Sequence, residues 1–197
     1  MDIKVQAMGD YQTNCYIASI NGKDLIIDPG MNSLPWIKQN VTNPIAVLNT
    51  HGHFDHVWSN DIVCKTYNIK LHTPKKDLFM LTMDSYGLGM PHSQADVEIE
   101  EDEEIDIEGI KIKFHFFPGH TPGCSMIQIN NDMFSGDFIF KDSIGRCDFP
   151  YSNVDDMKRS LKKVLSWEND YNIHPGHGIS TTLKEENNSL VQWLNYL

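Results

Sequence analysis

The chain has 197 residues, of which 40% are hydrophobic and 22% are charged, a composition typical of one globular domain rather than a disordered chain. Its formal net charge of −11 argues against nucleic acid as a partner, because binding to phosphates needs a basic surface. With no apolar run of membrane-spanning length and no pattern of a secretory signal at the N-terminus, we expect a cytoplasmic protein without a membrane partner.

The first part of the chain is predicted to begin with short strands joined by tight turns. Asn21-Gly22 between two β-type runs is a strong hairpin signal. The apolar run Ile45-Ala46-Val47-Leu48 is typical of a strand buried on both faces. In chain order we expect strands at 3–8, 14–20 and 24–28, a helix at 33–40 with Ser33 as its N-cap, a strand at 45–48, a helix at 57–67, a strand at 69–72 and a helix at 75–83.

Residues 84–96 contain Gly87, Gly89 and Pro91 and are predicted to form a loop, a candidate lid over a site. After this loop we expect strands at 104–107, 110–117, 124–130 and 132–135, a helix at 154–167, a strand at 171–174 and a helix at 183–195. This mixed order predicts sheets that are covered by helices. Because no linker rich in proline, serine or glycine interrupts it, residues 1–197 are expected to form one domain.

The densest group of potential metal ligands is Thr50-His51-Gly52-His53-Phe54-Asp55-His56, directly after a predicted buried strand. It places three histidines and one aspartate within six residues. Alternate residues of an extended segment point to the same side, so His51 and His53 are expected to face one way. Asp55 and His56 follow where the chain turns into the next helix. One metal ion cannot easily use all four side chains, whereas two adjacent ions can divide them.

Further candidate ligands follow three later strands. They are His120 in Pro118-Gly119-His120-Thr121-Pro122-Gly123, Asp137 in Ser135-Gly136-Asp137, and His177 in His174-Pro175-Gly176-His177-Gly178. Glycine and proline shape sharp turns and let the backbone approach a site closely. Four strand ends therefore deliver seven candidate ligands to one edge of the sheets. Imidazole and carboxylate groups suit zinc, iron and manganese.

On these residues the sequence resembles the metallo-β-lactamase superfamily of dinuclear hydrolases. Its H-x-H-x-D-H signature is matched from His51 to His56, and its later His, Asp and His are matched by His120, Asp137 and His177. The resemblance extends from Asp28-Pro29-Gly30 to His177. It implies an αββα sandwich of the α+β class, in which two mixed β-sheets lie face to face with helices on the outer faces.

The resemblance also implies a division of the ligands between two divalent metal ions. One ion is expected at His51, His53 and His120, a second at Asp55, His56 and His177, with Asp137 bridging both. Zinc is the first expectation, with iron or manganese as alternatives, and a hydroxide between the ions is expected to attack a carbonyl group. Asp55 is also a candidate catalytic residue that orients this nucleophile. Asp28 is expected to brace a ligand histidine.

Within the superfamily the sequence is similar to short, single-domain relatives of glyoxalase II, which hydrolyses thioesters such as S-lactoylglutathione. The likeness rests on His120-Thr121-Pro122-Gly123, Gly136-Asp137 and Gly145-Arg146-x-Asp148-Phe149. Arg146 falls near a basic residue that contacts glutathione in those enzymes, and is therefore a candidate substrate-binding residue. Asp148 departs from the pattern, since an aromatic residue commonly stands there. We expect a small thioester substrate, with a glutathione conjugate as one candidate.

Other functions stay open. A mononuclear iron persulfide dioxygenase has the same H-x-H-x-D-H cluster, and metal count together with oxygen uptake separates it from a hydrolase. Hydrolysis of another ester, a lactone or an amide would use the same site. A non-catalytic, metal-bound scaffold would keep its affinity for a partner after the metals are removed. Oligomeric state, metal identity and native substrate are not predicted by the sequence.

Overall fold

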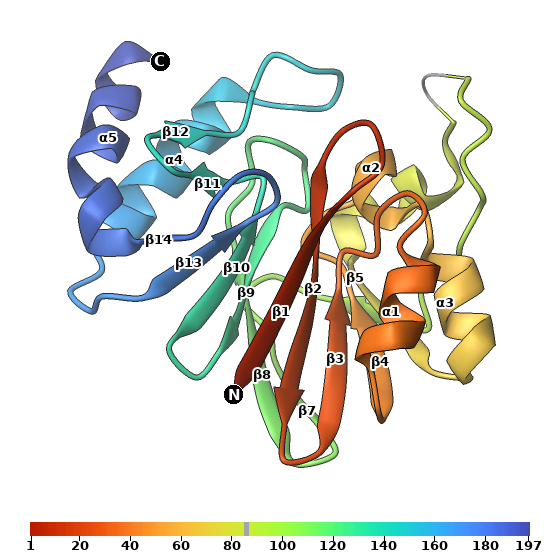
Figure 1. Cartoon of the computed structure of the whole chain (residues 1–197). Helices are drawn as coiled ribbons and strands as arrows, with labels where there is room; N and C mark the ends of the chain where they lie inside the picture. The colour runs from red at the N-terminus through yellow and green to blue at the C-terminus, as the bar shows by residue number, and fades with distance from the viewer. Residues whose placement is uncertain (85–86) are drawn as a thin grey trace.

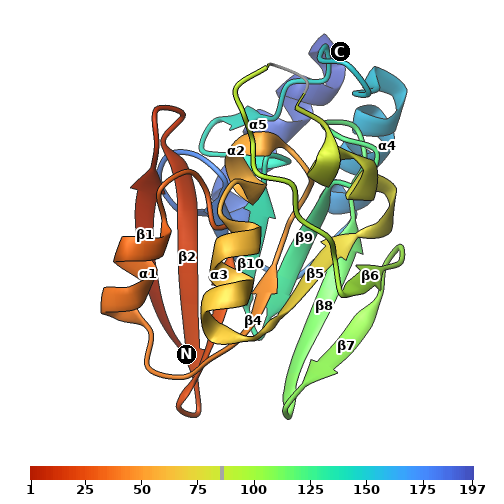
Figure 2. The same cartoon turned by 90° about the vertical axis from the view of Figure 1, so that its right-hand side faces the viewer.

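The computed structural model describes residues 1–84 and 87–197, which are arranged in four layers. Two six-stranded sheets pack face to face, and helices lie on the outer face of each sheet (Figures 1 and 2). Both sheets contain parallel and antiparallel pairs. The αββα sandwich of the α+β class that the sequence predicts is therefore confirmed.

The first sheet has the order β1-β2-β3-β4-β5-β6. Strands β1 to β3 pair antiparallel, and β3 to β6 run parallel to one another. Asn21 and Gly22, with φ of 52° and 76°, form the predicted tight turn of the second hairpin. The strands are β1 (Asp2–Met8), β2 (Thr13–Ile20), β3 (Lys23–Ile27), β4 (Pro44–Leu48), β5 (Lys70–Pro74) and β6 (Val97–Ile99).

The second sheet has the order β14-β13-β10-β9-β8-β7. Within this sheet β10 and β13 pair parallel and the other described pairs are antiparallel; a separate two-stranded ribbon, β11-β12, follows β10 in the chain. The strands are β7 (Glu104–Ile107), β8 (Ile110–Phe116), β9 (Ser125–Ile129), β10 (Asp132–Gly136), β11 (Ile139–Phe140), β12 (Ser143–Ile144), β13 (Asn172–Pro175) and β14 (Thr181–Thr182).

Alternation along the strands divides the buried side chains into three core layers. In β4, Leu48 packs between the two sheets, whereas Val47 packs under the helices of the first sheet. In β10, Phe134 points between the sheets and Met133 points toward the helices of the second sheet. Both strands are thus buried on both faces, as the continuous apolar run of β4 predicts.

Helices cover the outer face of each sheet. α1 (Leu34–Asn40) and α3 (Asn60–Tyr67) cover the first sheet, and α4 (Val154–Leu165) and α5 (Leu183–Tyr196) cover the second (Figure 1). The side chains of Asn153 and Thr182 cap α4 and α5 by accepting hydrogen bonds from backbone amides in the first turn. Among the described residues, no helix combines the length and apolar character that crossing a membrane requires.

Several elements differ from the sequence-based expectations. The helix expected at 57–67 is divided into α2 (Phe54–Val57) and α3, because Ser59 between them donates hydrogen bonds to the carbonyls of Pro29 and Gly30. The helix expected at 75–83 is a 3₁₀ helix, η1 (Lys75–Thr82). Ser33 stands at the N-cap of α1, as predicted, but makes no capping hydrogen bond through its side chain. The short strands β6, β11, β12 and β14 were missed, since two or three residues carry no readable alternation.

The loop predicted at 84–96 contains no helix or strand among its described residues. Residues 85–86 of this prediction lie outside the described residues, and a role as a lid stays a prediction.

A buried carboxylate stabilises the connection between α1 and β4. Asp24 accepts hydrogen bonds from Ser19 Oγ (2.5 Å) and from the amides of Thr42 (2.6 Å) and Asn43 (2.8 Å). Burial raises the pKa of Asp24, but these hydrogen bonds outweigh burial and hold the pKa below its usual value. The ionised form of Asp24 therefore stabilises the folded chain.

Candidate dinuclear metal centre

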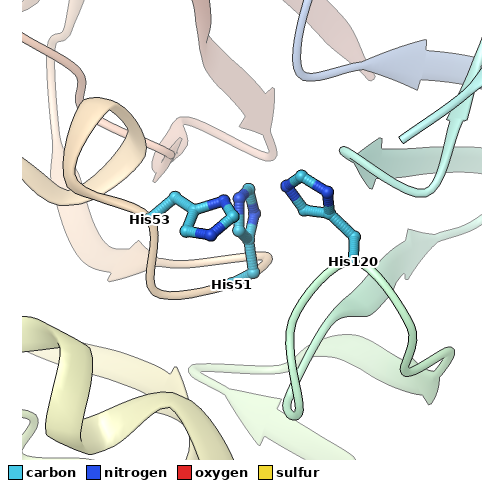
Figure 3. A group of neighbouring side chains, drawn as sticks. All are labelled: His51, His53 and His120. Atoms are coloured by element: carbon cyan, nitrogen blue, oxygen red, sulfur yellow. The ribbon is translucent and has the colours of Figure 1, made fainter. Parts of the chain in front are cut away.

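The first group of predicted ligands is His51, His53 and His120, whose rings surround a common space (Figure 3). One nitrogen of each imidazole lies within 4.8 Å of the others. His51 and His53 come from the loop after β4, and His120 comes from the loop between β8 and β9. His51 and His120 are buried and His53 is half-buried, so solvent reaches the group from the His53 side.

The second group is Asp55, His56 and His177, whose ligand atoms also lie within 4.8 Å of one another. Asp55 and His56 lie in the single turn of α2, which begins after His53, where the His56 amide donates to the His53 carbonyl over 3.0 Å. His177 comes from the loop after β13. Thr13 Oγ1 donates a hydrogen bond of 2.6 Å to Asp55 Oδ2 and thereby fixes the carboxylate.

Asp137 lies between the two groups. Its Oδ1 is 3.3 Å from His56 Nε2, and its Oδ2 is 3.3 Å from His120 Nε2 and 3.5 Å from His177 Nε2. Two ligand atoms that share a tetrahedral ion, with bonds of about 2.0–2.1 Å, lie about 3.3 Å apart. The distances therefore fit a carboxylate shared by two ions. A Cβ on Gly176 would overlap Asp137 Oδ1 and His56 Cε1, so this turn needs glycine.

Asp28 and Thr50 determine which imidazole nitrogens face the centre. Asp28 Oδ2 lies 2.9 Å from His56 Nδ1 and accepts a hydrogen bond of 2.6 Å from Thr50 Oγ1. Thr50 Oγ1 in turn lies 3.0 Å from His51 Nδ1. Because the Thr50 hydroxyl donates its proton to the Asp28 carboxylate, its oxygen accepts a hydrogen bond from His51 Nδ1. The carboxylate in turn accepts from His56 Nδ1. Nδ1 therefore carries the proton in both histidines, and Nε2 is left for a metal. The structure places Asp28 beside His56 Nδ1, and its role in bracing a metal ligand stays a prediction.

Within the described part of the chain, the atoms that face the centre lack hydrogen-bond partners. Among the described residues, His51 Nε2, His56 Nε2, His120 Nε2 and Asp137 Oδ1 are buried and accept or donate no hydrogen bond. Each buried polar atom without a partner costs about 1–3 kcal/mol. Cations would bind these atoms, and a donor set of imidazole and carboxylate suits zinc, iron or manganese. The residues present therefore fit a pair of divalent metal ions.

The electrostatics of the cluster also favour cations. Burial lowers the pKa of His51 and places that of His53 at about 3, so both imidazoles are neutral ligands. Burial raises the pKa of Asp55 and Asp137, but the neighbouring histidines, above all His56, outweigh this effect. The pKa of Asp55 is lowered to about 2, and that of Asp137 lies well below its usual value. The two ionised carboxylates likewise raise the pKa of His56 against the effect of burial. Metal ions at this site would replace the protons that the carboxylates attract.

Asp77, a buried residue of η1, was missed by the sequence reasoning. Its Oδ2 accepts hydrogen bonds from the Gly52 amide (2.9 Å) and from Thr121 Oγ1 (2.6 Å), and its Oδ1 accepts one from the Gly123 amide (2.6 Å). One carboxylate therefore anchors both loops that carry the first group of ligands. Asp77 lies 25 residues beyond Gly52, and no local pattern marks it.

Arg146, the predicted substrate-binding residue, lies beside the first group. Its carbonyl accepts a hydrogen bond of 2.8 Å from His120 Nδ1, which directs Nε2 of this histidine toward the centre. The exposed guanidinium makes two hydrogen bonds of 2.8 Å to Asp148 and lies 4.2 Å from the centroid of the Phe149 ring. That ring is 6.1 Å from the His53 ring. Contact between Arg146 and a substrate stays a prediction.

Fold and ligand geometry together define the class of protein. The metallo-beta-lactamase superfamily domain matches residues 8–177, and the chain belongs to this superfamily. An uncharacterized protein of Mycobacterium tuberculosis is 36% identical over 199 residues, with 88% of this chain and 89% of the relative covered. The hydroxyacylglutathione hydrolase GloC of Haemophilus influenzae is 29% identical, with 96% of each protein covered.

Solved structures show the same relationship. The B3 metallo-beta-lactamase BLEG-1 superposes with a TM-score of 0.88 at 27% identity, with 95% of this chain and 97% of that chain covered. A di-iron-bound form of TTHA1623 superposes with a TM-score of 0.83 at 29% identity, with 94% and 98% covered. The chain is thus a member of a superfamily of metallo-hydrolases, and its family binds divalent metals.

Proposed function

We propose that this protein is a dinuclear metal-dependent hydrolase that cleaves thioesters, with S-lactoylglutathione as the representative substrate. The observation that carries the proposal is the pair of ligand groups joined by Asp137. Similarity to the hydroxyacylglutathione hydrolase GloC supports a thioester as the scissile bond. Divalent ions bound at such a site lower the pKa of water to about 7 and polarise a carbonyl oxygen, which supplies both halves of a hydrolytic attack.

The side chains of the site divide between holding the ions and orienting the holders. His51, His53 and His120 would hold one ion, Asp55, His56 and His177 the other, and Asp137 both. Thr13 fixes Asp55 through its 2.6 Å hydrogen bond, so that this carboxylate can also orient the attacking water. Arg146, exposed beside the first group, would contact the polar thiol part of a substrate such as glutathione.

The proposal is tested with protein loaded with Zn²⁺ or Mn²⁺ and assayed for thiol release from S-lactoylglutathione. The same preparation is assayed with a lactone and a β-lactam, and its oxygen uptake is measured with a glutathione persulfide. Thioester hydrolysis that a chelator abolishes and added metal restores would support the proposal. Cleavage of the lactone or β-lactam alone would assign a different bond, and oxygen uptake with one iron per chain would establish the dioxygenase instead.

A further inference from the structure

A cavity of about 80 Å³ opens beside His53, on the side from which solvent reaches the first group. Whole small-molecule sites span about 300–1,000 Å³, so a cavity of this size fits one short substituent of a substrate rather than the entire substrate. Its wall is built from three parts of the chain: the start of α2, η1 with the residue that follows it, and the loop after β12. Besides His53 and Gly52, the described lining residues are Phe54, Met80, Met83, Pro150 and Tyr151.

The lining is mostly apolar and adaptable. Apart from the candidate metal ligand His53, its described lining contains no acidic or basic side chain. Met80 and Met83 form one wall, and methionine side chains are flexible enough to pack against apolar groups of different shapes. An apolar wall of this kind gains free energy when it covers alkyl groups, and it leaves any charged group without a partner.

The outer wall depends on a strained residue. Tyr151 has a φ of 70°, in the left-handed region that bulky side chains rarely adopt. Such a conformation costs about 1–3 kcal/mol and persists only where the surroundings hold it. Here the Tyr151 ring packs against Phe79 of η1, with ring centroids 5.0 Å apart. The loop after β12 thereby reaches η1 and completes the cavity, at a cost that is typical of functional segments.

The charged groups of this region lie outside the cavity. Arg146 pairs with Asp148 and covers the Phe149 ring, and none of these three residues lines the cavity. The Phe149 ring lies 6.1 Å from His53 and 6.2 Å from His120, so the Arg146 side and the cavity are two distinct approaches to the same imidazoles. One approach is polar and carries the Arg146–Asp148 ion pair, and the other is mostly apolar.

We propose that the cavity beside His53 binds the acyl group of the substrate and selects apolar acyl chains. This inference rests on the proposed thioester hydrolysis. A thioester carries an acyl chain on one side of the reacting carbonyl and a thiol-derived group on the other. The two approaches differ in polarity, as these two substituents do. Glutathione carries charged carboxylate and ammonium groups, which the apolar cavity excludes and the Arg146 side accepts. The acyl group therefore enters the cavity.

The test varies only the acyl chain. The metal-loaded protein is assayed with the S-propanoyl, S-butanoyl, S-pentanoyl and S-hexanoyl thioesters of glutathione, whose carbonyl groups are electronically alike. We expect kcat/KM to rise about fourfold for each added methylene group, equivalent to about 0.8 kcal/mol, until the cavity is filled. A kcat/KM that stays constant or falls along the series would overturn the inference while leaving thioester hydrolysis established.

A variant locates the effect. Met83→Gln keeps the length of the side chain but places an amide in the cavity wall, and should lower the ratio of kcat/KM for hexanoyl over propanoyl thioester about tenfold. Val191→Gln, an exposed apolar residue of α5 away from the cavity, is the matched control and should leave this ratio unchanged. Equal ratios in Met83→Gln and the wild type would remove Met83 from an acyl site.

A binding measurement separates this inference from the proposed function. Hexanoate, added to metal-loaded protein with ¹³C-labelled methionine methyl groups, should shift the signals of Met80 and Met83, and acetate at the same concentration should shift them much less. Loss of one signal in Met83→Gln assigns it. If no thioester is hydrolysed but these shifts occur, the proposed hydrolysis is wrong, whereas the inference that the cavity binds apolar acyl groups is supported. Hexanoate binding without these shifts would overturn the assignment of the cavity.

Discussion

Replacing Asp77 by asparagine should loosen the two loops that carry the first group of ligands while nearly preserving side-chain shape. The carboxylate accepts three buried hydrogen bonds, from the amides of Gly52 and Gly123 and the hydroxyl of Thr121. An amide cannot accept at both ends, so in either orientation one backbone N–H faces an NH₂ group. An unsatisfied buried donor costs about 1–3 kcal/mol. Part of this cost is offset, because burial disfavours the charged carboxylate of Asp77 and raises its pKa, and the variant removes that charge.

We therefore expect Asp77→Asn to lower the free energy of unfolding by about 2 kcal/mol, and Asp77→Ala, which leaves all three donors unpaired, by about 3–6 kcal/mol. Displaced imidazoles should also reduce kcat/KM for thioester hydrolysis by about tenfold or more in Asp77→Asn, because small misplacements of catalytic groups are costly. Stability is measured by urea denaturation at fixed metal concentration, since bound metal itself stabilises the fold.

Asp106→Asn is the matched control for this variant. Asp106 is an exposed aspartate that accepts one hydrogen bond from the Gly109 amide, so its substitution should change stability by no more than about 0.5 kcal/mol. If Asp77→Asn behaves like this control in both stability and kinetics, the carboxylate is not an anchor of the ligand loops, and the reasoning is refuted.

Three further predictions concern the turn at Gly176, the Arg146 side chain and the Asp24 carboxylate. Gly176→Ala should displace Asp137 and lower the metal content of saturated protein, measured by native mass spectrometry; an unchanged content would show that the turn tolerates a Cβ. Arg146→Ala should raise KM for a glutathione thioester more than it lowers kcat, whereas Arg159→Ala on α4 should alter neither; equal kinetics in both variants would exclude Arg146 from the substrate site. Asp24→Asn should lower the free energy of unfolding at pH 7, as measured by urea denaturation. Because the folded-state pKa of Asp24 lies below its unfolded value, the difference between the variant and the wild type should shrink as the pH falls below about 4. A difference that does not depend on pH would argue against a role for the ionised carboxylate.

The fold could be predicted from local sequence patterns, and the same patterns indicate that the candidate ligands lie close together. The run Ile45-Ala46-Val47-Leu48 reads as a strand buried on both faces, and the histidines after it mark where that strand ends. Glycine beside His120, Asp137 and His177 marks sharp turns. The structure brings these segments together around one centre, as their shared position after strand ends predicts.

The remaining features depend on contacts between distant segments, which leave no local signal. In the sequence, nothing distinguishes Asp77 from other aspartates in predicted helices. Only the folded structure brings its carboxylate into contact with the Gly52 and Gly123 amides. The cavity beside His53 needs Tyr151 in a conformation that its sequence disfavours, and that conformation is held by Phe79 far away in the chain. Tertiary contacts therefore override local preference here, as is common at functional sites.

The central claim is that two cations share the carboxylate of Asp137, and metal stoichiometry at saturation tests it most directly. Metal-free protein is titrated with Zn²⁺ or Mn²⁺ and the ions bound per chain are counted by native mass spectrometry. We predict two ions per chain for the wild type, and fewer for Asp137→Ala together with loss of nearly all hydrolysis. A wild-type chain that saturates at one ion, or an Asp137→Ala variant that still binds two and remains active, would contradict the claim.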